Sequence, residues 1–272
     1  MKGLRIGIIG HGNMGNAILK GIVKKNVTHI DNIIVTDTRN SAMEEAKRVS
    51  GCRAGGLSAV IDGSDYLIIA VEPWDSKGLL SEISGNISGQ TIISIMAGVR
   101  ISTMESILGN ENETPIARAM PNMAAMVGES ATCVSFNAAL TRKKEVKEIL
   151  SSVGTVIEVD EFALDAATAI AGSGPAYFFY LADSLIIAGE KIGLDRAVAR
   201  ELVAQTVYGA SLLMKNGCGS GEDIDIKDMI RKVASKGGTT QAALAVFEKN
   251  GMDDIIARAV IRAKERSGEL SG

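Results

Sequence analysis

A glycine-rich loop between a strand-like run and a helical run limits what this chain can fold into more than any other feature. The sequence IGIIGHGNMGNAILKG (6–21) places Gly10, Gly12 and Gly15 in GxGxxG spacing. The first glycine permits a tight turn, the second lets the backbone approach a pyrophosphate, and the third allows close packing of helix on strand. The stretch predicts the first βα unit of a dinucleotide-binding fold. The alternative is a glycine turn that binds nothing.

Strand-like and helical runs alternate from residue 1 to about 158. The expected strands are short, apolar and β-branched, and they cover 4–10, 32–37, 65–71, 90–96 and 155–159. Helical patterns between them cover 16–25, 41–50 and 75–83. Continuous apolar runs are typical of parallel strands that are buried on both faces. We therefore predict a Rossmann-type, doubly wound α/β domain over residues 1–158.

The pattern changes to helices alone after about residue 160. The expected helices are 162–171, 175–192, 196–215, 225–234, 240–250 and 252–267. Gly193, Gly217 and Gly251 stand where three of these helices should stop. We predict an all-α C-terminal domain over residues 159–272.

The helix expected over 196–215 carries more apolar residues than one small helical domain can bury. These residues are Leu202, Val203, Val207, Leu212 and Leu213. A surplus of this kind is typical of a protein–protein interface. We predict that this domain forms an obligate homodimer, or a higher homo-oligomer built from dimers, with each active site near the subunit interface.

Composition excludes several classes of protein. The net charge of −3 argues against a nucleic-acid partner. Cys52, Cys133 and Cys218 are isolated, so neither a disulfide framework nor a metal site is expected, and buried thiols in a reducing cytoplasm are the simplest interpretation. The longest apolar stretches are too short to cross a bilayer or carry Asp183, and no leader sequence is apparent, so we expect a cytoplasmic protein with no membrane partner.

The ends of the next strands should line the cofactor crevice. Asp37 favours NAD because it can accept from a ribose hydroxyl, whereas Arg39 favours NADP because it can bind a 2′-phosphate. A solvated turn is the alternative for both residues. AVEPW (70–74) and SIMAGV (94–99) end the two following strands. Pro73 either starts a helix or lies at the cofactor edge.

The sequence offers no obvious strong general acid for a hydride-transfer reaction. His11 lies in the glycine loop and either lines the cofactor or is a loop or surface imidazole, the commoner case; His29 lies in a connection. Tyr177, Tyr180 and Tyr208 fall on apolar helix faces and are expected in the core. Reduction of an imine that is already basic needs little help from such an acid.

Four motifs, in the same order over nearly the whole chain, make it resemble pyrroline-5-carboxylate reductase. They are GHGNMGNAI (10–18), ARAMPN (117–122), GSGPAYFFYLADSL (172–185) and VASKGGTTQAALAVFEKNG (233–251). The last motif is far more specific than the glycine fingerprint. The resemblance implies a Rossmann domain, a helical domain that interlocks two subunits, and reduction of the cyclic imine 1-pyrroline-5-carboxylate to L-proline by NADH or NADPH, the final step of proline biosynthesis.

The resemblance also implies roles for individual residues. The residues matching the family's cofactor loop and nicotinamide-side strand ends are Gly10, Gly12, Asn13, Met14, Ala70, Val71, Pro73, Met96, Ala97 and Gly98. The residues matching its loop for the substrate carboxylate and imine are Ser235, Gly238, Thr239 and Thr240. Two positions depart from the family pattern, because Glu72 stands where lysine is common and Lys236 where proline is common.

SKGGTTQAAL (235–244) is the stretch where we expect the substrate. A helix N-terminus binds anions, and the amides of Gly237 and Gly238 are open to a carboxylate because glycine has no side chain. Ser235 and Thr239 add hydroxyl donors, and Thr240 is expected to orient the imine nitrogen; Ser235 and Thr240 are the candidate catalytic residues. Lys236 either assists the carboxylate or faces solvent. The alternative is that Thr239 is only an N-cap.

Two other functions compete with imine reduction. A β-hydroxyacid dehydrogenase shares a similar glycine loop, but its helical domain needs a catalytic lysine; GSGPAYFF contains none, and the nearest candidates, Lys191 and Lys215, follow it by a turn or more of unrelated pattern. A catalytically silent dinucleotide-binding protein is the second alternative, because a fold alone does not assign activity.

Overall fold

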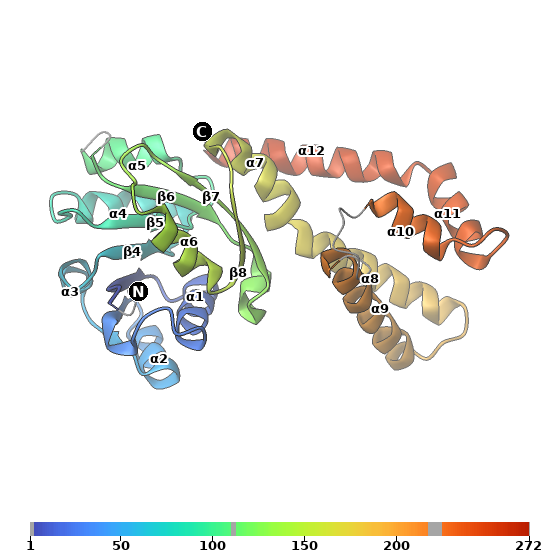
Figure 1. The fold of residues 1–272 in the computed structure, drawn as a ribbon, viewed down its shortest axis with the longest axis horizontal. Coiled ribbons are helices and arrows are strands. Elements are labelled where there is room, and N and C mark those ends of the chain that lie inside the picture. The colour runs from blue at the N-terminus through green and yellow to red at the C-terminus, as the bar shows by residue number, and fades with distance from the viewer. Residues whose placement is uncertain (1–2, 110–112, 217–224, 272) are drawn as a thin grey trace. The chain divides into compact units, whose positions relative to one another are not determined.

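The computed structural model describes residues 3–109, 113–216 and 225–271 (Figure 1). The chain divides into two compact units, the first made of 1–175 with 262–272 and the second of 176–261. The division into domains at residues 158 and 159 stays a prediction.

The first unit is built on one eight-stranded sheet with the order β3-β2-β1-β4-β5-β6-β7-β8. The strands are β1 (Ile6–Ile9), β2 (Ile33–Thr36), β3 (Arg53–Ala54), β4 (Tyr66–Ile69), β5 (Thr91–Ser94), β6 (Ile116–Met120), β7 (Ser130–Phe136) and β8 (Gly154–Glu158). Neighbours from β3 to β6 are parallel, β6 and β7 are antiparallel, and β7 and β8 are parallel. The sheet confirms the predicted Rossmann-type α/β fold.

Helices cover both faces of this sheet (Figure 1). They are α1 (Asn13–Lys24), α2 (Asn40–Ser50), α3 (Leu57–Asp62), α4 (Ser76–Ile83), α5 (Ile101–Leu108) and α6 (Lys143–Ser151). Side chains alternate between faces along β4: Tyr66 and Ile68 pack with α1 and α6, whereas Leu67 and Ile69 pack with α3, α4 and α5. Because both faces are buried, the strand is apolar at every position.

Strands β3, β6 and β7 and helices α3, α5 and α6 were not predicted from the sequence, and neither was the antiparallel pairing of β6 with β7. β6 contains Arg118, and β7 contains Ser130 and Thr132, whose buried hydroxyls bond each other at 3.1 Å. Polar residues of this kind break an apolar run. The link from β6 to β7 holds only the short helix η3 (Met123–Val127), which is too short for a parallel crossover and so leaves an antiparallel pair.

Helices follow β8, as the sequence predicted. They are η4 (Glu161–Ala163), α7 (Leu164–Ala167), the π-helical turn η5 (Thr168–Gly172), α8 (Gly174–Lys191), α9 (Arg196–Asn216), α10 (Ile226–Val233), α11 (Thr239–Lys249) and α12 (Met252–Ser271). Gly193 and Gly251 follow the ends of α8 and α11. Their φ angles are +99° and +65°, values that favour glycine. Gly217 and Cys218 lie outside the described residues. Cys52 and Cys133 are buried free thiols, and burial raises the pKa of each.

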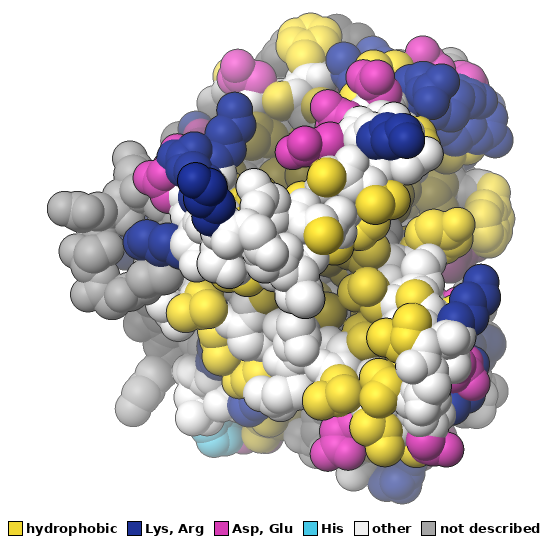
Figure 2. All heavy atoms as spheres, turned by 90° about the vertical axis from the view of Figure 1, so that its right-hand side faces the viewer, with side chains coloured by type: hydrophobic (Ala, Val, Ile, Leu, Met, Phe, Trp, Pro, Cys, Tyr) yellow, Lys and Arg dark blue, Asp and Glu magenta, His cyan; other side chains and the backbone are white. Residues whose placement is uncertain are grey.

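The second unit buries very little of its own apolar surface. Of its described hydrophobic residues, Ala199 alone is buried. Figure 2 shows the molecule from the right-hand side of Figure 1, where α8 to α11 are labelled. Hydrophobic side chains are spread over this surface among charged ones. Tyr177, Tyr180 and Tyr208 were expected in the core, and that expectation is wrong within this chain because all three are exposed. Their helices have apolar faces that the chain itself leaves uncovered.

One helical stretch, Glu161–Lys191, is long and apolar enough to cross a membrane by length and composition. Little of it is buried within the chain. A helix that another protein chain covers has the same properties, so this is weak evidence for a membrane span. The absence of a membrane partner stays a prediction.

Candidate functional site

The glycine loop joins β1 to α1 and packs against the end of β4. Gly10 has φ of +97°, and its amide donates to the Thr36 carbonyl at 2.9 Å. A Cβ on Gly10 would lie 2.6 Å from the Ala70 carbonyl oxygen, and one on Gly15 would overlap the Gly10 carbonyl. Only glycine fits at these two positions, so the tight turn and the close packing of α1 both depend on them.

The second glycine of the loop faces open space. Gly12 is the N-cap of α1, no side chain caps the helix, and no atom lies within 4 Å of where its Cβ would be. Gly12 and Asn13 are exposed and Met14 is half-buried. The first turn of α1 has no acidic residue, so its unpaired amides and the helix dipole favour an anion here.

Asp37 and Arg39 are bound to each other beside this loop. The Asp37 carboxylate accepts from the His11 amide at 2.8 Å, from the Arg39 amide at 2.9 Å and from Arg39 Nε at 3.0 Å. Burial raises the pKa of Asp37, but these hydrogen bonds outweigh it and hold the pKa below its usual value. The Asp37 side chain is 6% exposed and that of Arg39 62%. The arginine is therefore the member of the pair that a ligand can reach.

His11 is buried rather than a surface imidazole, contrary to expectation. It is 5% exposed, and neither ring nitrogen has a hydrogen-bond partner among the described residues. Burial is the main cause that lowers the pKa of His11, and the positive charges of Lys20 and Arg39 lower it further. The carboxylates of Glu45 and Asp37 raise the pKa, but by less. Burial thus favours the neutral form of the ring, which does not suit His11 to act as a general acid.

Two further loops follow β4 and β5, the next two strands of the sheet beyond β1. β4 pairs with β1 and β5 pairs with β4, all in parallel, with Ile9, Ile69 and Ser94 in register. Ala70 to Pro73 and Met96 to Gly98 therefore lie at the same edge of the sheet as the glycine loop. Pro73 begins the short helix η2 (Pro73–Asp75), Met96 is buried, and Gly98 has φ of +76°. The structure brings together the three loops that the sequence predicted for the cofactor.

The candidate substrate loop lies in the second unit, between α10 and α11. Gly238 is the N-cap of α11 and no side chain caps this helix. The alternative that Thr239 is an N-cap is therefore wrong, since Thr239 is the first helical residue. Thr240, at the second helical position, is half-buried, whereas Ser235, Lys236 and Thr239 are exposed. The first turn of α11 has no acidic residue, so it too favours an anion.

The two glycine amides of this loop already have partners within the chain. The Gly237 amide donates to Gln241 Oε1 at 2.6 Å, and the Gly238 amide donates to the Ser235 carbonyl at 3.0 Å. A carboxylate at Gly237 would have to displace the Gln241 side chain. The amides of Thr239 and Thr240 lack acceptors within the helix and are the more accessible donors.

The sequence analysis gave no role to a buried ion pair in the first unit. Arg118 of β6 is 6% exposed, and its Nη1 donates to Glu161 Oε1 at 3.1 Å. The same oxygen accepts from the Ile101 amide at 2.8 Å, which caps α5. An arginine in the middle of a strand-like motif, ARAMPN, is the signal that could have revealed it, because a buried arginine needs a partner.

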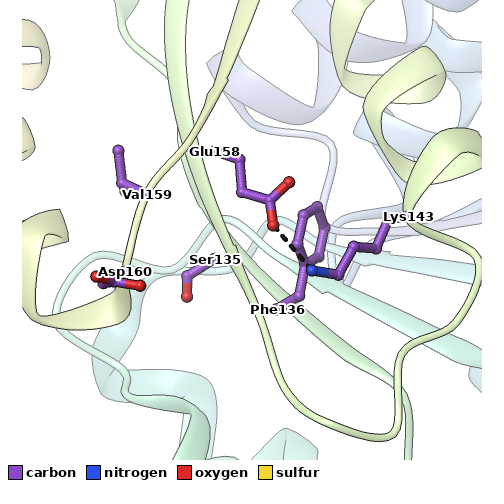
Figure 3. Close-up of a pocket in the computed structure, with 6 residues that line it drawn as sticks. All are labelled: Ser135, Phe136, Lys143, Glu158, Val159 and Asp160. Atoms are coloured by element: carbon purple, nitrogen blue, oxygen red, sulfur yellow. Dashed lines mark hydrogen bonds and ion pairs between the residues drawn. The ribbon is translucent and has the colours of Figure 1, made fainter.

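A cavity of about 360 Å³ lies elsewhere, at the ends of β7 and β8 (Figure 3). Glu158 binds Lys143 at 2.8 Å and Lys147 at 2.7 Å, and these lysines hold the pKa of Glu158 below its usual value. Lys143 Nζ also lies 4.9 Å from the centre of the Phe136 ring. No predicted site residue lines this cavity. Among the described residues no group of three or more His, Cys, Asp or Glu could hold a metal ion.

Two family models match the chain. Residues 161–270 match the model of the pyrroline-5-carboxylate reductase dimerisation domain, which supports a homo-oligomer. Residues 5–98 match a model described as NADP oxidoreductase, coenzyme F420-dependent. This second match runs from β1 through the glycine loop to Gly98, so it covers all three loops predicted for the cofactor.

Similar proteins cover the chain almost completely. Pyrroline-5-carboxylate reductase of Methanosarcina acetivorans is 38% identical over 99% of both chains, and pyrroline-5-carboxylate reductase 1 of Bacillus subtilis is 34% identical over 98% of this chain and 89% of its own. The enzyme structure from Coxiella burnetii has 29% identity and a TM-score of 0.90, covering 99% of both chains. The Plasmodium falciparum structure, with NADP bound, has 30% identity, a TM-score of 0.86 and full coverage of both chains. The chain belongs to the pyrroline-5-carboxylate reductase family.

Proposed function

We propose that this protein reduces 1-pyrroline-5-carboxylate to L-proline with a hydride from NADPH or NADH. The observation that carries the proposal is that a member of this family presents two uncapped helix N-termini, one at the glycine loop of α1 and one at the SKGGTTQ loop of α11. The first suits the pyrophosphate of a dinucleotide. The second suits the single carboxylate of a small cyclic imino acid.

The residues at the sheet edge fit a dinucleotide. The first-turn amides of α1 beside Gly12 receive the phosphates, and Arg39 lies where a 2′-phosphate of the adenosine ribose would bind. Ala70, Val71 and Pro73, with Met96, Ala97 and Gly98, receive the nicotinamide end. The dinucleotide, when bound, supplies the hydride.

The SKGGTTQ loop holds and orients the imino acid. The amides of Thr239 and Thr240 donate to the carboxylate, Lys236 adds a positive charge, and Ser235 adds a hydroxyl donor. The Thr240 hydroxyl donates to the imine nitrogen. The hydride adds to the carbon of the C=N bond, and the nitrogen gains a proton to become the amine of proline. Because the imine is basic, it takes this proton readily, and no strong general acid is required.

We also propose that the protein works as a homodimer in the cytoplasm. The exposed apolar side chains of α8 and α9 give a large surface that a second copy can bury. The buried free thiols Cys52 and Cys133 suit a reducing compartment.

The test is to measure NADPH and NADH oxidation with 1-pyrroline-5-carboxylate and to identify proline as the product. A 3-hydroxy acid that reduces NAD or NADP, with no turnover of the imine, would indicate a β-hydroxyacid dehydrogenase instead. Dinucleotide binding with no turnover of either substrate would indicate the silent binding protein. The same assay with both cofactors gives the cofactor preference.

A further inference from the structure

The Met96–Gly98 loop connects β5 to α5. Two segments contact this connection, one just before the second unit in the sequence and one just after it. The leading segment contributes Glu161 of η4, which caps α5. The trailing segment is the last turns of α12, which lie against Gly98. All of these residues belong to the first unit.

Glu161 fixes the start of α5 through one carboxylate oxygen. Its Oε1 accepts from the Ile101 amide at 2.8 Å and from Arg118 Nη1 at 3.1 Å. The carboxylate is placed at the N-terminus of the helix, where the helix dipole favours negative charge. Arg118 is buried in β6, and this ion pair joins α5 to the sheet. Ile101 follows Gly98 by three residues, so the cap sets where the loop ends.

The end of α12 restrains the same loop from a second direction. A Cβ on Gly98 would lie 2.8 Å from the Leu270 carbonyl oxygen, so the two backbones are in close contact. Ser267 donates to Asp165 at 2.8 Å, which ties this end of α12 to α7. The left-handed φ of Gly98, the contact with Leu270 and the cap at Ile101 together leave the loop little freedom.

We propose that Glu161 is a positioning residue for hydride transfer: by capping α5 and pairing with Arg118, it holds the Met96–Gly98 loop in the position that orients the nicotinamide. This rests on the proposed function, in which that loop receives the nicotinamide end. In this role Glu161 acts through the backbone of the loop, by way of the Ile101 amide. A displacement of about 1 Å at a reacting group can lower a rate by up to about 100-fold.

The experiment compares Glu161→Ala with Glu158→Ala in the full-length protein. Glu158 is a matched control because its carboxylate is also held in ion pairs, here with Lys143 and Lys147, and neither partner belongs to α5. A double variant, Glu161→Ala with Arg118→Met, removes the cap without leaving a buried arginine unpaired. It keeps the test valid if the single variant fails to fold.

Three quantities are measured: kcat, the affinity for ADP-ribose, and the kinetic isotope effect with NADPH deuterated at the transferred position. We expect kcat to fall about 10-fold in the Glu161 variants and less than about 2-fold in Glu158→Ala. ADP-ribose lacks the nicotinamide, so its affinity should stay within about 2-fold of wild type. The isotope effect should rise, because hydride transfer becomes more rate-limiting when the nicotinamide is misplaced.

A fall in kcat with an unchanged isotope effect would mean only a smaller fraction of folded enzyme, and it would overturn the proposal. Loss of ADP-ribose binding, or a kcat equal to that of the control, would overturn it as well. These outcomes presuppose an active wild type. A wild-type protein that does not turn over 1-pyrroline-5-carboxylate would instead contradict the proposed function.

Discussion

The two units of this protein, one an α/β sheet and one helical, are stabilised in different ways. The first unit has two cores, one on each face of its sheet, and side chains such as Leu67 and Ile68 are fully buried. The second unit has several long helices and, among its described hydrophobic residues, buries Ala199 alone. The first unit can fold on its own contacts, whereas the second needs another surface.

The difference is visible within single helices. In α1 the apolar residues form one buried stripe, with Ala17, Ile18 and Ile22 facing the sheet and Lys20 and Lys24 facing water. In α9, Leu202, Leu212 and Leu213 are exposed on a helix that is apolar over much of its surface. An amphipathic helix needs one neighbour, while a helix that is apolar nearly all round needs several. For α9 a second copy of the chain is the simplest source of them.

The largest expected effect follows from charging that exposed surface. Leu213→Lys in α9, 53% exposed in the single chain, should weaken the dimer by roughly 3–5 kcal/mol, because an unpaired charge would be buried at the interface. Val49→Lys in α2, 44% exposed, is the matched control and should leave assembly unchanged. Sedimentation velocity at assay concentration measures both. A Leu213→Lys protein that remains dimeric and active would show that α9 is not at the interface.

A substitution in the core of the first unit should act in a different way. Ile68→Ala in β4 removes buried atoms between α1 and α6, and it should lower the free energy of unfolding by about 2–5 kcal/mol. Because no second chain is involved, this loss should be the same at low and high protein concentration, whereas the unfolding midpoint of Leu213→Lys should depend on concentration. Urea titrations at two protein concentrations test the difference. Equal concentration dependence in both variants would remove the distinction between the units.

The sequence predicted the features that depend on local pattern. The glycine loop, the strands β1, β2, β4, β5 and β8, and the helices after residue 160 all follow from spacing and periodicity. β6 and β7 were missed because Arg118, Ser130 and Thr132 interrupt their apolar runs, and their polarity is satisfied only by partners that are distant in sequence. Local pattern carries no information about such partners.

The candidate site, like the fold, was predicted only where local sequence pattern determines it. Which loops meet at the sheet edge follows from strand order, but their hydrogen bonds do not. The binding of Asp37 to Arg39 and the use of the Gly237 amide by Gln241 depend on distances that only the folded chain sets. The burial of His11 likewise depends on packing that only the folded chain sets.

Substitution of Thr240 tests whether the second unit contributes a catalytic residue as well as a subunit interface. Thr240→Val keeps the shape of the side chain but removes the hydroxyl proposed to bind the imine nitrogen. We expect kcat/KM for the imine to fall roughly 10- to 150-fold, with folding and cofactor affinity nearly unchanged. Thr141→Val, at an exposed position before α6, is the control for loss of a hydroxyl alone. A Thr240→Val protein that unfolds easily but retains its specific activity would indicate a purely structural threonine.

Arg39 is the corresponding test in the first unit. Arg39→Ala should weaken the binding of NADPH more than that of NADH, by roughly 10-fold, because a charge-assisted contact is lost from a guanidinium that is 62% exposed. The substitution also leaves the Asp37 carboxylate without its cation, and its negative charge then repels a 2′-phosphate. KM values for the two cofactors measure this preference. Equal losses with both would rule out a 2′-phosphate contact.

The smallest expected effect concerns the pH dependence of stability in the first unit. Burial lowers the pKa of His11 below its ordinary value of 6.5, so the folded state favours the neutral ring. The unfolded chain therefore takes up a proton on His11 at a higher pH than the folded chain does. The stability that depends on the neutral ring is present above pH 6.5, and it is lost as the pH falls through the pKa of the folded state. Glu45 and Asp37 oppose this loss, and Lys20 and Arg39 add to it.

His11→Gln, which stays neutral throughout, should lose less stability than wild type between pH 7.5 and pH 5. His29→Gln is the control, because the His29 side chain is 69% exposed, and it should follow the wild-type curve. Urea midpoints across this range measure all three proteins. The loss should not depend on protein concentration, since His11 lies in the unit that folds on its own contacts. If it does depend on concentration, acid is dissociating the helical interface first, and the two units are not independent in stability.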